Sequence, residues 1–288
     1  MWNQIADQIS EATGQPFTAD HQRPVGGGSV NQAYAVSNDQ QAYFVKLNDA
    51  ARMGMFEAEA LGLREMWKTQ TIRVPKPICW GTCDRSSYIV LEWLDLGYGT
   101  HDAWTAMGQQ LAAMHRATSS KGFGWEHDNT IGFIPQKNPW TEDWVTFFRD
   151  HRLGYQFQLA RKRGGHFPQQ DSLMQALPEL LSGHDPEPSM VHGDLWSGNA
   201  AVTQADEPVL FDPAAYYGDR EVDLAMSELF GRFPQDFYRA YNDAYPLDEG
   251  YERRKTLYNL YHIINHFNQF GGSYESQANS MIRRLVGS

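Results

Sequence analysis

The sequence predicts an α+β fold of two lobes, a small β-rich N-terminal lobe over residues 1–94 and a larger, mainly helical lobe over residues 95–288. Three observations indicate this division. Strand-like runs are concentrated between residues 24 and 94, whereas apolar residues at helical spacing dominate from residue 103 onward. The segment DLGYGT (95–100), which separates the two regions, has the turn-forming composition of a linker.

The N-terminal lobe is expected to begin with a short amphipathic helix, because Ile5, Ile9 and Ala12 share one helical face before Gly14. The segments NQAYAV (31–36) and QAYFVKL (41–47) flank the turn-forming pair Asn38-Asp39 and predict a hairpin. Residues 52–69 predict a helix, and PICWGTC (77–83) and SSYIVLEWL (86–94) predict two further strands.

In the C-terminal lobe, helical periodicity predicts helices around residues 111–115, 144–159 and 219–230. A longer helix near the end carries Leu257, Leu260, Ile264 and Phe267 on one face. Short apolar runs at 189–191 and 208–211 predict two β segments between these helices.

Composition excludes several classes of protein. The 288 residues include 9 Trp, 14 Tyr and 15 Phe, enough for large cores without disulfides. A formal charge of -11 disfavours nucleic acids and anionic membranes, and we find no signal peptide or long apolar run. Cys79 and Cys83 have no matching His or Cys pair for a zinc site, so we expect a soluble protein of a reducing cytoplasm.

A glycine-rich segment, VGGGSVN (25–31), lies between two predicted strands. Gly26, Gly27, Gly28 and Ser29 could bring backbone N–H groups close to phosphate oxygens, because glycine has no side chain in the way. The string matches neither of the common phosphate-binding fingerprints, so taken alone it favours a plain flexible hairpin over a phosphate-binding loop.

Lys46 ends an apolar strand shortly after this loop. In kinases a lysine in this place contacts the α- and β-phosphates of ATP and is oriented by a glutamate of the next helix. Glu57, Glu59 and Glu65 all lie on the predicted helix, and spacing alone does not choose among them. A solvated lysine at a strand end is the alternative.

The string VHGDLWSGN (191–199) carries the strongest chemical signal, because Asp194 and Asn199 reproduce the D-x-x-x-x-N spacing of a kinase catalytic loop. Asp194 is the predicted base that accepts the proton of a substrate hydroxyl. Asn199 is a predicted ligand of Mg²⁺. For His192 we expect a structural role in the loop rather than proton transfer.

Asp212 follows the apolar run VLF (209–211) and is the predicted second ligand of Mg²⁺, where the ion would neutralise phosphate charge. A simple Asp-Pro turn is the alternative. Pro213 cannot adopt left-handed backbone conformations, so we expect that this segment does not flip as an activation switch.

The predicted strand 86–94 runs into the linker through Glu92, Trp93 and Leu94. A strand that crosses between lobes leaves backbone groups unpaired at Glu92 and Leu94, which suits the hydrogen-bonding edge of adenine. An ordinary buried strand would have the same sequence.

Together these segments resemble the fructosamine kinase (ketosamine-3-kinase) family, related to aminoglycoside and choline kinases, whose fold is bilobal and protein-kinase-like. The resemblance covers nearly the whole chain and rests on HGDLWSGN (192–199), FDPAAYYGDREVDLAMSELFG (211–231), FEAEALGL (56–63) and GWEHDNTIG (124–132). It implies that Glu59 is the partner of Lys46, that Glu92 to Leu94 bind adenine, and that Asp223 steadies the catalytic loop.

The resemblance also implies ATP and Mg²⁺ as cofactors and phosphorylation of the 3-hydroxyl of a ketosamine, free or on a glycated amine, in a deglycation reaction. Bacterial relatives favour ribulosamines or erythrulosamines over fructosamines. An acceptor is expected near a set of residues beside the catalytic segments: Trp196, Tyr216, Tyr217, Asp219, Arg220 and Glu221. For the five residues from Tyr216 to Glu221, core packing or surface solvation is an equal alternative.

Two other functions remain open. One is a kinase of the same fold for an aminoglycoside, choline or a free sugar. The other is an ATP-binding pseudokinase, which the intact set Lys46, Asp194, Asn199 and Asp212 disfavours. The oligomeric state is not indicated by the sequence.

Overall fold

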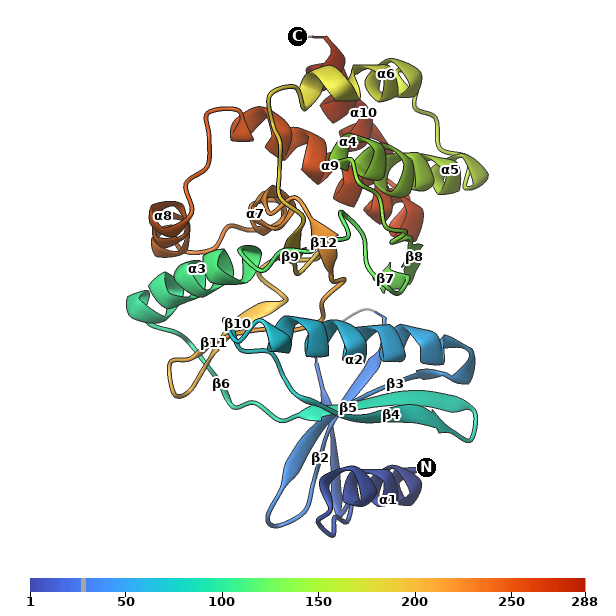
Figure 1. Ribbon diagram of the computed structural model, residues 1–288. Helices are drawn as coiled ribbons and strands as arrows, with labels where there is room; N and C mark the ends of the chain where they lie inside the picture. Colours follow the sequence, from blue (N-terminus) through green and yellow to red (C-terminus); the bar gives the residue numbers. More distant parts are fainter. Residues whose placement is uncertain (27–29, 288) are drawn as a thin grey trace.

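An antiparallel sheet of five strands forms most of the N-terminal region of the computed structural model, which describes residues 1–26 and 30–287 (Figure 1). The strands lie in the order β1-β2-β3-β5-β4. Their bounds are β1 (His21–Val25), β2 (Gln32–Ser37), β3 (Ala42–Asp49), β4 (Pro77–Cys83) and β5 (Ser86–Glu92). Helix α1 (Trp2–Thr13), the short turn η1 (Ala50–Arg52) and helix α2 (Met53–Lys68) complete this region.

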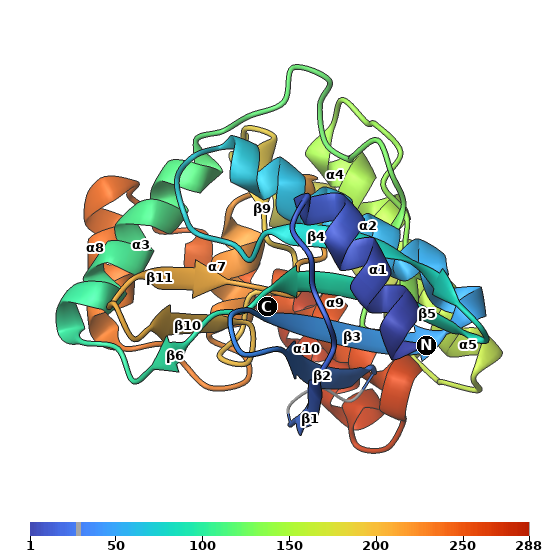
Figure 2. The ribbon, with the colours of Figure 1, turned by 90° about the horizontal axis from the view of Figure 1, so that it is seen from below.

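Helices α1 and α2 cover opposite faces of the sheet (Figures 1 and 2). Side chains alternate along each strand, so each strand contributes residues to both faces. Val45 and Leu47 of β3 pack with Ile5 and Ile9 of α1 in one buried cluster. Lys46, between them in the sequence, points to the other face, where its side chain reaches α2. Figure 1 shows α2 lying between the sheet and the C-terminal region, so this second face is the one that meets the rest of the chain.

The C-terminal region is mainly helical, and α9 (Tyr251–Phe270) contacts α5, α7 and α10 within it. The other helical segments are α3 (His101–His115), α4 (Trp144–Phe147), η2 (Phe148–Gly154), α5 (Tyr155–Lys162), α6 (Gln170–Leu180), α7 (Glu221–Ser227), α8 (Gln235–Ala244) and α10 (Tyr274–Val286). The strands are β6 (Leu96–Gly97), β7 (Asn129–Ile131), β8 (Ile134–Gln136), β9 (Ser189–Val191), β10 (Ala200–Thr203), β11 (Pro208–Leu210) and β12 (Tyr216–Gly218).

Two of these strand pairs place the chemistry-bearing segments side by side. β10 pairs antiparallel with β11, and β12 pairs antiparallel with β9. The loop 192–199 therefore begins at the end of β9 and leads into β10, while the segment after β11 returns to β9 through β12. These pairings bring residues 194, 199 and 212 to one place in the fold.

One hydrophobic cluster joins the two regions. Ile89 and Leu91 of the sheet are buried together with Leu111, Leu195 and Leu210 of the C-terminal region. This shared core holds the sheet against the helical part of the chain. The division at residues 94 and 95 stays a prediction.

The α+β composition and the main elements of the N-terminal region are confirmed. β2 and β3 form the predicted hairpin, and the predicted strands at 77–83 and 86–94 correspond to β4 and β5. Two predictions need correction. The helix expected at 144–159 is interrupted by the π-helical segment η2, and the linker contains β6, which pairs with Val202 and Thr203 of β10. The hydrophobic periodicity of the sequence signals neither feature. The π-helical turns of η2 lie within a helical pattern, and β6 has only two residues, too few to show alternation.

Within residues 1–26 and 30–287, no helix combines the length and the apolar character that a membrane span requires.

Candidate active site

A cavity of about 600 Å³ lies between the sheet and the C-terminal region. One wall comes from β2, β3 and α2, and the opposite wall comes from the ends of α7 and α9 and the start of α10. The residues used below that line it are Phe44, Lys46, Glu59, Asn129, Asp194, Trp196, Asn199, Asp212, Phe230, Asn265, His266, Gln269, Phe270 and Tyr274. The lining therefore includes the four residues predicted to take part in phosphoryl transfer: Lys46, Asp194, Asn199 and Asp212.

Lys46 forms two ion pairs in the wall of this cavity. Its Nζ lies 2.7 Å from Oε1 of Glu59 and also contacts the carboxylate of Asp212. Burial lowers the pKa of Lys46, but the charges of Asp212 and Glu59 outweigh it and raise the pKa overall. Lys46 is therefore a fixed cation. Of the three glutamates that spacing left open, Glu57 is exposed and Glu65 pairs with Lys68, so the structure selects Glu59.

Asp223 holds the backbone at the start of the loop 192–199. Its carboxylate accepts hydrogen bonds from the N–H groups of His192, at 2.7 Å, and Gly193, at 2.8 Å. Burial alone would raise the pKa of Asp223, but the hydrogen bond from His115 and the other donors lower it overall, so it stays ionised. Gly193 has φ of 81°, and a Cβ there would lie 2.2 Å from the carbonyl oxygen of Ala214. Only glycine fits this position.

His192 is a buried structural residue. Its Nε2 donates to the carbonyl of Phe211 at 2.9 Å, and its Nδ1 accepts the N–H of Asp194 at 3.3 Å. Burial lowers the pKa of His192, so the ring is neutral and both of its nitrogens are engaged. These bonds tie the loop 192–199 to the strand end before Asp212.

Asp194, Asn199 and Asp212 converge on the floor of the cavity. Nδ2 of Asn199 donates to the carbonyl of Asp194 at 2.9 Å and to its Oδ2 at 3.2 Å. Burial, followed by the charge of Asp212, raises the pKa of Asp194 to about 7. Asp212 has φ of 58°, a left-handed backbone conformation that is rare outside glycine.

The donor set at this floor suits a hard divalent cation. Asp212 offers a carboxylate, and Asn199 has Nδ2 bonded to Asp194, which leaves Oδ1 without a partner among residues 1–26 and 30–287. Mg²⁺ prefers oxygen ligands of this kind. The metal-binding role of both residues stays a prediction.

The predicted adenine-binding residues are not among those that line the cavity. The expectation of a free backbone at Glu92 is wrong for its N–H, which donates to the carbonyl of Lys76 at 2.9 Å because β5 is still paired there. The Glu92 carboxylate bonds Arg73, and Trp93 packs on Phe44 with 6.5 Å between ring centroids. No hydrogen bond of the Leu94 backbone is seen in the described chain.

Gly26 is exposed and lies outside the cavity lining. The predictions for Gly27, Gly28 and Ser29 concern residues outside the part of the chain that the structure describes.

Five of the six predicted acceptor residues lie elsewhere. Trp196 lines the cavity, whereas Tyr216, Tyr217, Asp219, Arg220 and Glu221 do not. Tyr216 is buried beneath the guanidinium of Arg152, and the hydroxyl of Tyr217 donates to Glu65 at 3.1 Å. Asp219 and Glu221 are fully buried in an ion network. The correction has a simple reason, since proximity in sequence to Asp212 does not decide on which side of β12 and α7 a side chain falls.

Sequence reasoning missed the wall opposite Lys46. Asn265, His266 and Gln269 at the end of α9, with Phe270 and Tyr274, supply much of this surface. A signal was present, because polar residues interrupt the apolar face of α9 and several of them are buried: Asn259, His262, Asn265 and Asn268. Buried polar side chains in a core helix usually have a specific partner or role.

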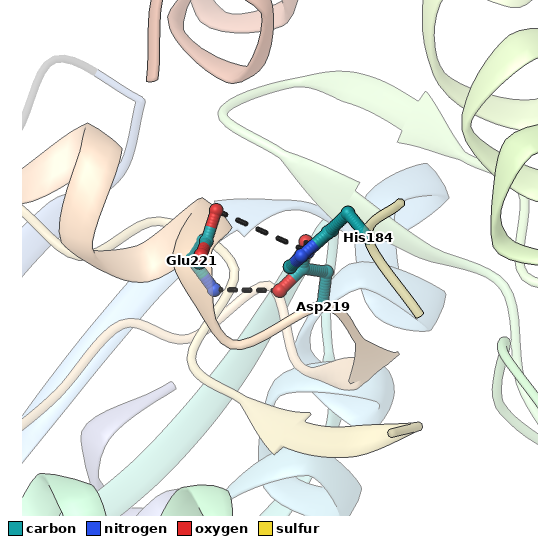
Figure 3. A group of neighbouring side chains, drawn as sticks. All are labelled: His184, Asp219 and Glu221. Carbon is teal, nitrogen blue, oxygen red and sulfur yellow. Dashed lines mark hydrogen bonds and ion pairs between the residues drawn. The ribbon is translucent and has the colours of Figure 1, made fainter. Parts of the chain in front are cut away.

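His184, Asp219 and Glu221 form a cluster away from the cavity, with ligand-type atoms all within 4.8 Å of one another (Figure 3). The Glu221 carboxylate accepts two hydrogen bonds from Arg254, at 2.7 and 2.8 Å, and Asp219 accepts the hydroxyl of Tyr258. Arg254 thus already supplies the positive charge. The cluster is an ion network that joins the loop at residue 184 to α7 and α9.

His184 makes the stability of this network dependent on pH. Burial lowers the pKa of His184, but the hydrogen bond and charge of Asp219, helped by Glu221, raise it overall. A raised pKa means that the protonated ring stabilises the fold fully below about pH 6.5, and that this stability is lost as pH rises through the folded-state value. We expect the His184→Gln variant to lack this decline in the free energy of urea unfolding. Superimposable pH profiles of the two proteins would contradict the assignment.

Comparison with known proteins agrees with this geometry. The family model described as fructosamine kinase matches residues 1–288. A probable ketoamine kinase of Synechocystis sp. is 56% identical over 99% of this chain and 97% of its own length. The chloroplastic protein-ribulosamine 3-kinase of Arabidopsis thaliana is 46% identical over 90% of this chain and 80% of its own length.

Solved structures give the same picture. A crystal structure from Haemophilus somnus, whose name assigns it provisionally to the fructosamine-3-kinases, has a TM-score of 0.93, with 33% identity over 99% of this chain and 98% of its own. An aminoglycoside phosphotransferase in complex with ADP and hygromycin B has a TM-score of 0.67 at 15% identity, covering 99% of both chains. This second likeness concerns the fold and confirms the bilobal, protein-kinase-like architecture. The chain belongs to the fructosamine kinase family.

Proposed function

We propose that this protein is an ATP-dependent kinase that phosphorylates the 3-hydroxyl of a ketosamine, the adduct of a sugar with an amine. The placement of Lys46, Asp194, Asn199 and Asp212 around one cavity carries the proposal, because phosphoryl transfer requires a fixed cation, a base and metal ligands together. The names of the family and of its relatives supply the acceptor class.

In the proposed reaction Asp194 accepts the proton of the 3-hydroxyl while the hydroxyl oxygen bonds to the γ-phosphorus of ATP. The bond between the γ-phosphorus and the bridging oxygen breaks, and ADP leaves with that oxygen. Burial, the largest cause, raises the pKa of Asp194 above that of a free carboxyl, which suits it to accept a proton, because a base works best when its pKa is near the working pH.

Lys46, oriented by Glu59, contacts the α- and β-phosphates in this proposal and neutralises part of their charge. Asn199 and Asp212 would hold Mg²⁺, which would supply further neutralisation of the phosphate charge. A structural neighbour was solved with ADP bound, which supports a nucleotide in the same cleft.

For the sugar part we propose a preference for ribulosamines or erythrulosamines over fructosamines. The Arabidopsis relative, at 46% identity, is named for ribulosamine. We also propose a cytoplasmic location, which agrees with two cysteines that are both free. The acceptor is a small molecule or a glycated amine on a protein.

One experiment tests the acceptor class. Purified protein is incubated with Mg-ATP and ribulosamines, erythrulosamines, fructosamines, aminoglycosides, choline or free sugars, and ADP release is followed. We expect turnover with ketosamines, fastest with ribulosamines or erythrulosamines. Turnover confined to aminoglycosides, choline or free sugars would reject the ketosamine assignment, and ATP binding without turnover of any acceptor would favour a pseudokinase.

A further inference from the structure

The segment from Gly124 to Gln136 forms several hydrogen bonds with the backbone that follows Asp212. Gly124 and Tyr217 exchange two backbone hydrogen bonds, of 2.9 and 2.8 Å. The side chain of Asn129 donates to the carbonyl of Ala215 at 2.8 Å, and that of Gln136 donates to the carbonyl of Ala214 at 3.1 Å. The β7–β8 hairpin, which contains part of the string GWEHDNTIG, thus contacts residues 214–217 by both backbone and side chains.

Further hydrogen bonds among buried side chains fix the orientation of the Asn129 and Gln136 amides. Oδ1 of Asn129 accepts hydrogen bonds from Gln136, at 2.9 Å, and from Asn138, at 3.0 Å. Two donors on Oδ1 leave Nδ2 as the only group that faces Ala215, so the amide cannot turn over without losing three bonds. The hydroxyl of Tyr261 donates to Oε1 of Gln136 at 2.6 Å, which orients that amide too.

Arg152 closes the network from behind. It is fully buried, yet no carboxylate lies within ion-pair distance of it in residues 1–26 and 30–287. Its guanidinium donates to Oδ1 of Asn138 at 2.8 Å and to the carbonyl of Lys137 at 2.7 Å, and it lies 4.0 Å from the centre of the Tyr216 ring. A buried cation that bonds only neutral oxygens, lies against aromatic faces and leaves its Nε without a hydrogen-bond partner in the described chain is costly, which indicates a positional role.

These contacts converge on the backbone beside Asp212. Asp212 has φ of 58°, a strained conformation that a non-glycine residue keeps only where the surrounding structure imposes it. Ala214 is held on both sides, since its N–H donates to the backbone carbonyl of His192 at 2.9 Å and its own carbonyl accepts from the side chain of Gln136. Pro213, between the two, has a restricted φ of its own.

We propose that Asn129, Gln136 and Arg152 are positioning residues that hold Asp212 in its strained conformation, with the carboxylate directed into the cavity. The inference rests on the proposed metal-binding role of Asp212. Asn129 also lines the cavity. The hydrogen-bond network that contains it therefore links the site, by way of Arg152 and Tyr261, to the helical core.

The test replaces Gln136 with leucine, which keeps most of the volume and removes both donated bonds. The affinity for Mn²⁺ is measured by electron paramagnetic resonance with a non-hydrolysable ATP analogue, and the affinity for the analogue alone is measured in EDTA. We expect the metal affinity to fall by about 10- to 100-fold, the usual cost of losing support behind a metal ligand, with nucleotide binding in EDTA unchanged.

Asn268→Leu is the matched control. Asn268 is also a buried amide, it bonds Gln156 instead of residues 212–217, and it does not line the cavity. It should lose stability without a change in metal affinity. Tyr261→Phe, a milder change that removes one bond to Gln136, should give a metal affinity between those of the wild type and Gln136→Leu.

Three outcomes overturn the proposal. Metal affinity that is unchanged in both Gln136→Leu and Tyr261→Phe, or that falls equally in Asn268→Leu, removes the positioning role while leaving metal-dependent turnover by the wild type intact. A wild-type protein that turns over ketosamines but binds no Mn²⁺ with the analogue removes the metal role of Asp212, and the proposal with it. A Gln136→Leu variant that does not fold leaves the decision to Tyr261→Phe.

Discussion

We expect replacement of Asp194 with alanine to lower kcat by about 10²-fold or more with little change in ATP affinity, because the variant loses the proposed base while Lys46 and Asp212 stay in place. Asp194→Asn should lose a comparable factor, since the amide cannot accept the proton although it has nearly the same shape. The measurement is the initial rate of ADP release at saturating Mg-ATP and ketosamine.

Asp185→Ala is the control for this prediction. Asp185 is exposed and lies in the loop before β9, outside the cavity lining. Its loss should leave kcat unchanged. If Asp194→Asn retained the wild-type kcat, Asp194 would not be the base, and the role of the loop 192–199 would have to be limited to binding.

Replacing Arg254 with methionine lowers the free energy of unfolding by about 3–5 kcal/mol, because it leaves a buried carboxylate without its counter-charge. Arg254 and Glu221 are both buried and joined by two hydrogen bonds, of 2.7 and 2.8 Å, and Arg254 also bonds Asp248 at 2.7 Å. The measurement is urea unfolding followed by circular dichroism at neutral pH.

Lys255→Met, one position further along α9, is the matched control. Lys255 is partly exposed and pairs with Glu228 and Glu252, so its loss should cost no more than about 1 kcal/mol. The double variant Arg254→Met with Glu221→Leu should recover much of the stability, because it removes the unpaired charge as well. Equal losses for the two single variants would show that the buried pair contributes no more than a surface pair.

Much of the candidate site could be predicted because it is encoded locally. Asp194 and Asn199 belong to one loop, and their separation along the chain already fixes which side chains can meet. The placement of Lys46 follows from alternation in β3, because a charged residue between Val45 and Leu47 must face the side of the sheet opposite α1. Asp212 ends an apolar run that pairs with the strand after Asn199.

The choice among alternatives required the tertiary structure. Glu57, Glu59 and Glu65 lie on one helix, and only the packing of α2 on the sheet brings Glu59 to Lys46. Tyr216 and Asp219 lie only a few positions after Asp212 in the sequence. The direction of β12 and α7 nevertheless turns their side chains into the core.

The sequence by itself determined the α+β fold class, and it predicted the loop 192–199 and the candidate metal ligands from spacing within short segments. Three features were decided by the tertiary structure alone. They are the cavity wall formed by His266 and its neighbours on α9 and α10, the ion network at Glu221, and the hydrogen bonds of Asn129 and Gln136 to the backbone beside Asp212. Hydrogen bonds of the network and of the Gln136 contacts join residues 33 to 125 positions apart, so no local pattern specifies them. They form only when burial of the shared core brings distant helices together.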